Sequence, residues 1–352
     1  MYNKKQNLIT NRGLENNINC NSIDIEADLL NCIDEIIGFN GVLPNDPPFE
    51  KHPYLDLPEY QLQNFDKYII GTFPPISHLL DNVEIIQAGI NQLTLPTGNL
   101  ISRPTIPFFH GNDAFYLWKL LLFDNELLEL QAIEDRNEKK NYLINKLKSL
   151  KINYSDIIMT TQRNNYSPND SELCNICPNL SLIKSIINNP QAKYLNFNTS
   201  SLFNGSGIKL ENNNHLIKVE SNQSLDLFLR TLQDLGFQLE FDLFNGLGWQ
   251  TINLNNINDF KNKVYTKLKI NATTVNIENQ ILKNINREYE IITSASPSGS
   301  ASRGLGGNQI YTNWHNNPEN INLQTPTNEF RKKIYSHFRN INEWEQLQAM
   351  NI

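Results

Sequence analysis

Strand-like and helix-like segments alternate along most of this 352-residue chain, and this alternation restricts its fold more than any other feature. Short apolar runs bounded by turn residues predict strands at residues 68–70, 154–161, 192–200, 238–244, 249–254 and 287–296. Apolar residues at helical spacing predict helices at residues 112–123, 138–150, 180–189, 225–237 and 325–341. Such alternation is typical of an α/β fold, and we expect a three-layer α/β/α sandwich with a mainly parallel sheet.

Composition narrows the class of protein. A hydrophobic content of 39% in a chain of this length is enough for a core that needs no covalent staples. The four cysteines are too few for a disulfide framework, and the amino terminus has no apolar signal segment. The most apolar stretch, residues 117–123, is far shorter than a membrane span. We therefore expect a soluble, cytoplasmic protein with no membrane partner.

The chain divides into two unequal parts. Residues 1–60 hold a polar segment, one amphipathic helix at residues 23–39 and a proline-rich connector. Residues 61–345 form the predicted α/β domain, interrupted by an Asn-rich insertion at about residues 204–275.

Two loops follow predicted strands and are candidates for ligand binding. Ligands of parallel sheets bind beyond the carboxyl ends of the strands. "GTFPPISH" (residues 71–78) follows the first strand, and residues 291–307, rich in Ser and Gly, follow the last. Small residues let the backbone approach phosphates closely, and Arg303 adds one bidentate donor. A flexible linker has the same composition, but the position directly after a strand favours a binding loop.

Five segments in order resemble the uracil-DNA glycosylase superfamily, in particular its hypoxanthine, mismatch-specific and modified-base branches. They are "KYIIGTFPP", "FFHGNDAFYLWKLL", "INYSDIIMTTQRNNYSPNDSEL", "AKYLNFNTSSLF" and "ITSASPSGSASRG", within about residues 65–338. The resemblance implies one α/β/α domain with a four-stranded parallel sheet and a pocket at its carboxyl edge. It also implies a monomeric enzyme that flips a nucleotide out of DNA and hydrolyses its N-glycosidic bond without a metal or other cofactor.

The resemblance places the pocket floor at Gly71, Thr72, Phe73 and Pro74. Phe73 stands where several relatives carry the Asp or Asn that orients the attacking water, and a phenyl ring cannot polarise water. We therefore expect Asn112 or Asp113 to orient the attacking water, with His110 beside them. His78 is a further candidate for this role. An Asn-Asp pair ahead of an apolar helix is also an ordinary N-cap, and either His can be a pocket-wall residue.

Other positions would contact the base. Phe109, together with Phe73 and Phe108, can stack on a flipped base, although Phe108 fits the core equally well. Asn198 lies where the superfamily reads the base's Watson–Crick edge, and an Asn side chain can donate and accept at once. The last segment aligns in two registers, so either Ser294 or Ser296 replaces the His or Asn that steadies the departing base.

The remainder of that segment would contact DNA. The resemblance to the mismatch-specific branch assigns this role to Ser298, Gly299, Ser300 and Arg303. Cys174 and Cys177 form an isolated pair, and we expect no iron–sulfur cluster there.

The favoured function is excision of a damaged or modified base, in base-excision repair or in defence against phage DNA with modified bases. Two alternatives remain at this stage. Phe73 and Phe115 favour a non-catalytic sensor of nucleic acid or nucleotides, and the net charge of −7 favours a hydrolase of free nucleosides or nucleotides.

Overall fold

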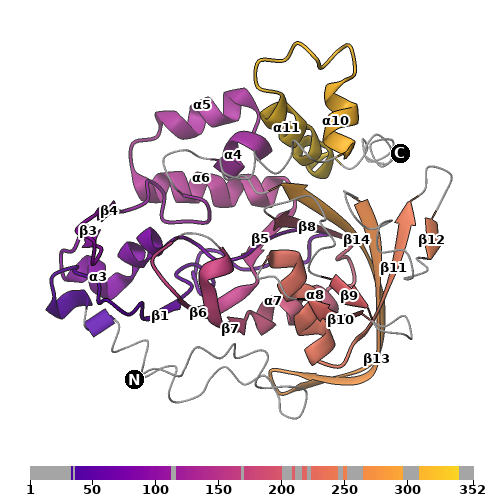
Figure 1. Ribbon diagram of the computed structural model, residues 1–352, viewed down its shortest axis with the longest axis horizontal. Helices are drawn as coiled ribbons and strands as arrows, with labels where there is room; N and C mark the ends of the chain where they lie inside the picture. Colours follow the sequence, from indigo (N-terminus) through magenta and orange to yellow (C-terminus); the bar gives the residue numbers. More distant parts are fainter. Residues whose placement is uncertain are drawn as a thin grey trace.

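A seven-stranded sheet forms the centre of the molecule in the computed structural model (Figure 1). The structure describes residues 33–34, 36–111, 116–167, 170–199, 208–210, 216–219, 223–244, 249–251, 265–295 and 309–340. The strand order is β12-β11-β13-β14-β8-β2-β5. The strands are β2 (Lys67–Gly71), β5 (Ile152–Asp156), β8 (Tyr194–Thr199), β11 (Gln238–Phe244), β12 (Trp249–Thr251), β13 (Tyr265–Ile277) and β14 (Gln280–Ala295).

The sheet is mixed, so the expectation of a mainly parallel, four-stranded sheet is wrong. Strands β14, β8, β2 and β5 pair in parallel, whereas β13, β11 and β12 extend the sheet by antiparallel pairing. The physical reason is a long hairpin of β13 and β14. Its two-residue turn, Glu278 and Asn279, has positive φ at both positions, which matches the twist of antiparallel strands.

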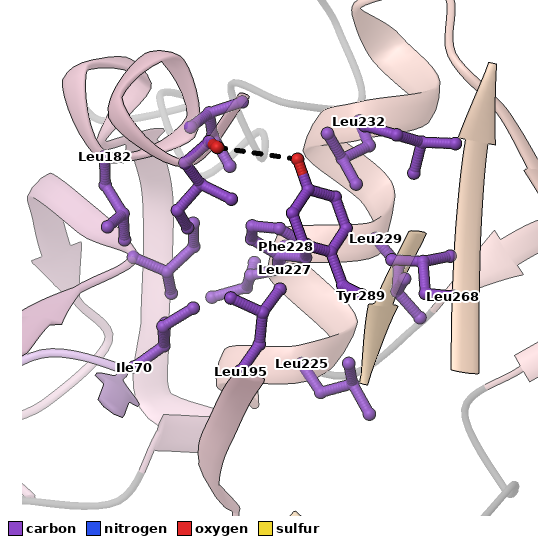
Figure 2. Close-up of a cluster of buried hydrophobic side chains, with 14 of the residues drawn as sticks. Ile70, Leu182, Leu195, Leu225, Leu227, Phe228, Leu229, Leu232, Leu268 and Tyr289 are labelled. Carbon is purple, nitrogen blue, oxygen red and sulfur yellow. Dashed lines mark hydrogen bonds between the residues drawn. The ribbon is translucent and has the colours of Figure 1, made fainter. Parts of the chain in front are cut away.

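Helices pack against both faces of the sheet (Figure 1). One face carries α7 (Leu180–Asn188) and α8 (Ser224–Asp234). The other carries α4 (Tyr116–Leu121), α6 (Arg136–Ser149) and α11 (Pro326–Arg339). Successive side chains of each strand point to opposite faces of the sheet, so two separate hydrophobic cores form, one on each face. Ile70 and Leu195 point toward Phe228 of α8 (Figure 2), while their neighbours Ile69 and Tyr194 lie in the core under α11.

A second, three-stranded sheet lies beside the first and consists of β1 (Phe49–Lys51), β6 (Ile158–Arg163) and β7 (Leu173–Pro178). The single strand expected at residues 154–161 is therefore two strands. The break occurs at the buried Ile157, whose N–H donates to the Gly71 carbonyl. The remaining elements are η1 (Ile76–Asp81), α3 (Val83–Gln87), β3 (Gln92–Thr94), β4 (Leu100–Ser102), α5 (Asp124–Ala132), η2 (Asp170–Glu172), β9 (Ile208–Leu210), β10 (Leu216–Val219) and α10 (Gln309–His315).

Helices expected from local periodicity agree with α6, α7, α8 and α11. Of the helix expected at residues 23–39, residues 33–34 and 36–38 are helical, and the other residues up to 35 lie outside the described ranges. The helix expected at residues 112–123 is described from Tyr116, as α4. None of the helices in the described ranges has the length and apolarity that crossing a membrane requires.

Candidate functional site

Buried polar side chains gather at the carboxyl ends of the parallel strands, on the sheet face that α11 covers. They come from alternate positions: Tyr154 and Asp156 of β5, Asn196 and Asn198 of β8, and Ser294 of β14. None of the five is more than 6% exposed. Burial of polar groups is costly unless they are hydrogen-bonded, so such a cluster requires a structural or functional explanation.

Gly71, at the end of β2, makes this gathering possible because β2 lies between β5 and β8. A Cβ atom at Gly71 would lie 2.0 Å from Asp156 Oδ1 and 2.5 Å from the Tyr154 hydroxyl. The side chains of β5 therefore lie across the backbone of β2. The glycine of "GTFPP" is needed for this close approach.

Replacement of Gly71 by Ala should destabilise the protein by about 1–3 kcal/mol, because Asp156 and Tyr154 must move to admit the methyl group. Urea unfolding measures this free energy. Gly38→Ala is the matched control, since a Cβ there meets nothing within 4 Å. Equal unfolding free energies for the two variants would contradict the close approach at Gly71.

Asp156 is the centre of a hydrogen-bond network. The Tyr54 N–H donates to His52 Nδ1 (3.1 Å), so the proton of a neutral His52 lies on Nε2, which donates to Asp156 Oδ2 (2.8 Å). The Tyr154 hydroxyl donates to Asp156 Oδ1 (3.2 Å) and accepts from His110 Nε2 (2.7 Å). Burial and the Asp156 charge raise the pKa of Tyr154 well above its usual value, so the phenol keeps its proton.

His110 is the half-buried end of this network. Its φ of 51° is unusual for a residue with a side chain, and strained conformations of this kind concentrate at functional sites. Hydrogen bonds from Gly111 N to the Phe108 carbonyl and from Ile106 N to the Gly111 carbonyl hold the turn. Burial lowers the pKa of His110, which keeps the imidazole neutral at pH 7.

A second chain of hydrogen bonds begins at His78, on η1. His78 Nδ1 bonds the Tyr54 hydroxyl, which donates to Asp81 Oδ2 (2.6 Å), and Arg136 pairs with Asp81 Oδ1 (2.7 Å). Because the Tyr54 proton goes to Asp81, His78 is the donor in its contact with Tyr54. Burial is the main cause that lowers the pKa of His78 to about 3.

Acid should therefore destabilise the protein through His78. The unfolded chain binds a proton at this residue below its usual pKa of 6.5, whereas the folded protein binds it only near pH 3, so stability falls with pH across that window. Between pH 7 and pH 5 the loss should be about 2 kcal/mol. The measurement is the unfolding free energy of wild type and His78→Asn at both pH values. A variant with the same pH dependence as wild type would refute this assignment.

A buried ion pair of Arg163 and Glu50 holds the "GTFPP" loop in place. Arg163 bonds Glu50 Oε1 (2.8 Å) and donates to the Pro74 carbonyl (2.7 Å). The Phe73 ring lies beneath the Arg163 guanidinium (5.7 Å) and edge-on to His52 (5.5 Å). Thr72 hydrogen-bonds Asp170, and burial raises the pKa of Asp170 to about 6.

The two phenylalanines before His110 lie in an aromatic cluster. Phe108 is fully buried and stacks on Trp118, and Phe109 is 2% exposed and packs on Tyr154 at 4.5 Å. Phe73 is only half-buried, so of these three rings it is the most accessible. Stacking of a base on Phe109 stays a prediction.

Asn198 and Ser294 meet Tyr335 of α11. The Tyr335 hydroxyl donates to Asn198 Oδ1 (2.6 Å), and Ser294 Oγ lies 3.0 Å from the same hydroxyl. Asn198 Nδ2 is buried and has no hydrogen-bond partner. The Asn198 side chain lies close enough to the Tyr154 hydroxyl for a hydrogen-bond interaction of poor geometry, which slightly opposes the rise in the pKa of Tyr154 and links both halves of the site.

The structure thus brings Gly71, Thr72, Phe73, Pro74, His78, Phe109, His110, Asn198 and Ser294 to one end of the parallel strands. Sequence reasoning missed His52, Tyr54, Tyr154, Asp156 and Tyr335. For Tyr154 and Asp156 a signal existed, because both occupy alternate positions of a buried strand. Within the described ranges, no cluster of His, Cys, Asp and Glu is arranged to hold a metal ion.

The other predicted residues, Asn112, Asp113, Ser296, Ser298, Gly299, Ser300 and Arg303, lie outside the described residues. We compared the chain with protein-family models, curated proteins and solved structures, and none of these comparisons found a match.

Proposed function

We propose that this protein is a DNA glycosylase of the uracil-DNA glycosylase type, which flips a damaged or modified base out of DNA and hydrolyses its N-glycosidic bond. The fold supports this. Four of the five resembling segments supply residues of β2, β5, β8 and β14, which pair in parallel and have helices on both faces. On this proposal, the protein has a three-layer α/β/α core whose parallel part is extended by β13, β11 and β12.

The observation that carries the proposal is the placement of Asp156 and Asn198 on either side of Gly71. Cleavage of an N-glycosidic bond develops positive charge on the sugar and negative charge on the departing base. A buried carboxylate suits the first charge and the water that attacks it, and an unpartnered amide N–H suits the second. We assign Asp156 to the sugar side and Asn198 to the base.

The neighbours of Asp156 prepare it for this role. His52 and Tyr154 each donate to one carboxylate oxygen, which leaves lone pairs on both oxygens for a water molecule. His110, which bonds Tyr154, is followed in the sequence by Asn112 and Asp113, the residues expected to orient the water. The Ser- and Gly-rich segment after β14 would bind the DNA backbone.

The test uses full-length protein and oligonucleotides that carry one uracil, hypoxanthine, mismatched, hydroxymethylated or glucosylated base each. Alkali then breaks the strand wherever a base has been released. We expect breakage with at least one of these substrates and its loss in a variant with Ala at both Asn112 and Asp113. Absence of breakage on all of them would overturn the proposal, and DNA binding without breakage would favour the sensor.

A second candidate is hydrolysis of free nucleosides or nucleotides, which needs the same bond cleavage without DNA. The net charge of −7 favours it, as does the pairing of Arg136 and Arg163 with carboxylates. Release of base from free nucleosides, together with DNA binding too weak to show a steep salt dependence, would identify this activity instead.

A further inference from the structure

The hydroxyl of Tyr154 lies between two groups, and it has one proton to donate. It is 3.2 Å from Asp156 Oδ1 and 2.7 Å from His110 Nε2. A carboxylate can only accept a hydrogen bond, whereas a neutral imidazole presents either a donor or an acceptor at Nε2, depending on its tautomer. The carboxylate therefore determines the direction of both bonds. Tyr154 donates to Asp156, and His110 donates to Tyr154.

The opposite direction would be costly in this place. A Tyr154 proton turned to His110 would leave the phenol oxygen, as a second acceptor, against a charged oxygen of Asp156. Tyr154 is 0% exposed and Asp156 is 5% exposed, so water does not replace the lost donor. Hydrogen bonds to buried charged groups are the costliest to lose. His52 already donates to the other oxygen of Asp156 at 2.8 Å, so the carboxylate itself is held in position.

The same arrangement leaves Nδ1 of His110 as an acceptor. His110 is half-buried, unlike its two partners in the network. Within the described part of the chain, its Nδ1 makes no hydrogen bond, and this atom is not among the fully buried ones. Burial lowers the pKa of His110, and the charge of Asp156 opposes that effect. The carboxylate that fixes the tautomer thus also stabilises the imidazolium that forms when Nδ1 takes up a proton.

We propose that Tyr154 is a positioning residue that, directed by Asp156, fixes the proton of His110 on Nε2 and so makes Nδ1 the acceptor for the attacking water. The water rests on the proposed function, whereas the fixed tautomer does not. In the reaction, the water oxygen bonds to the sugar carbon while the C–N bond breaks and its electron pair leaves with the base. One water proton passes to Nδ1, and His110 later releases it to solvent. The departing base takes a proton from solvent.

Asp156→Asn gives the sharpest test of the tautomer. The amide oxygen can keep the bond from His52, and the NH2 group then donates to the Tyr154 hydroxyl. The phenol proton must turn to His110 Nε2, so the imidazole proton should move to Nδ1. Nitrogen NMR of full-length, histidine-labelled protein at pH 7 distinguishes the two tautomers. The signals of His110 are identified by their loss in His110→Asn, because Asn tolerates a positive φ.

Tyr154→Phe removes the link itself and is compared with Tyr68→Phe. Tyr68 is equally buried, and its hydroxyl accepts one side-chain hydrogen bond, from Asn189 Nδ2 at 3.0 Å, on the opposite face of the sheet. In Tyr154→Phe both tautomers of His110 should appear, and kcat for base release should fall on the order of tenfold with little change in KM. In Tyr68→Phe the tautomer and kcat should stay as in wild type. The thermal midpoints of both variants show whether they are folded.

The possible outcomes separate the fixed tautomer from the glycosylase. A wild-type His110 with its proton on Nδ1, or the same tautomer in wild type and Asp156→Asn, would overturn the inference. An unchanged kcat in Tyr154→Phe of an active enzyme would overturn the positioning role. Wild type that releases no base, but whose tautomers change as expected, would refute the glycosylase and leave the fixed tautomer established.

Discussion

Asp156→Asn should lower the rate of base excision on the order of 10²–10³-fold while the protein remains folded. The amide has nearly the shape of the carboxylate: its oxygen can keep the hydrogen bond from His52, and its NH2 group can donate to the Tyr154 hydroxyl, which then accepts instead of donating. The negative charge that would stabilise the sugar cation and orient the water is lost. Single-turnover rates on the substrate identified with the oligonucleotide panel measure the effect without interference from product release.

Asp242→Asn is the matched control for this variant. Asp242 is also 5% exposed and is paired with Lys269 at 2.7 Å, but it lies on β11, at the other end of the sheet from β5. It should lose stability without losing excision beyond what unfolding explains. Comparable excision rates for Asp156→Asn and wild type would remove Asp156 from the chemistry.

Arg163→Met should lower the free energy of unfolding by about 3–5 kcal/mol, because it leaves Glu50 buried without a counter-ion. Both side chains are 2% exposed, and burial already raises the pKa of Glu50 against the opposing effect of Arg163. The same substitution releases the Pro74 carbonyl, and with it the "GTFPP" loop. Urea unfolding at pH 7 measures the loss.

Two further variants show how much of the lost stability comes from the unpaired charge of Glu50. Adding Glu50→Leu to Arg163→Met should recover much of the lost stability, because the stranded charge is gone. Lys51→Met, on the same strand as Glu50, removes an exposed pair with Asp56 and should cost at most about 1 kcal/mol. A cost for Arg163→Met as small as that for Lys51→Met would show that the ion pair does not hold the loop.

Local patterns predicted the helices well. The apolar faces of α7, α8 and α11 repeat at helical spacing, so their existence and approximate limits follow from neighbouring residues alone. The strand β13 was missed because many of its residues are polar, and its place depends on pairing with β14 on one side and β11 on the other. The mixed character of the sheet follows from that pairing.

The candidate site likewise contains residues that the sequence named and residues that only the structure identifies. The sequence named Gly71, His78, His110 and Asn198 as candidates from the short segments in which they stand. It did not name their partners. His52 bonds Asp156 across 104 positions of the chain, and Tyr335 bonds Asn198 across 137.

The residue types and the strand ends on which they stand are properties of short segments, and the sequence was sufficient for them. Which groups the Asn198 amide contacts, and which carboxylate lies beside Gly71, depend on how β5, β8 and α11 pack together. Hydrogen bonds act over about 3 Å and require a defined direction, so only the folded chain assigns each donor its acceptor.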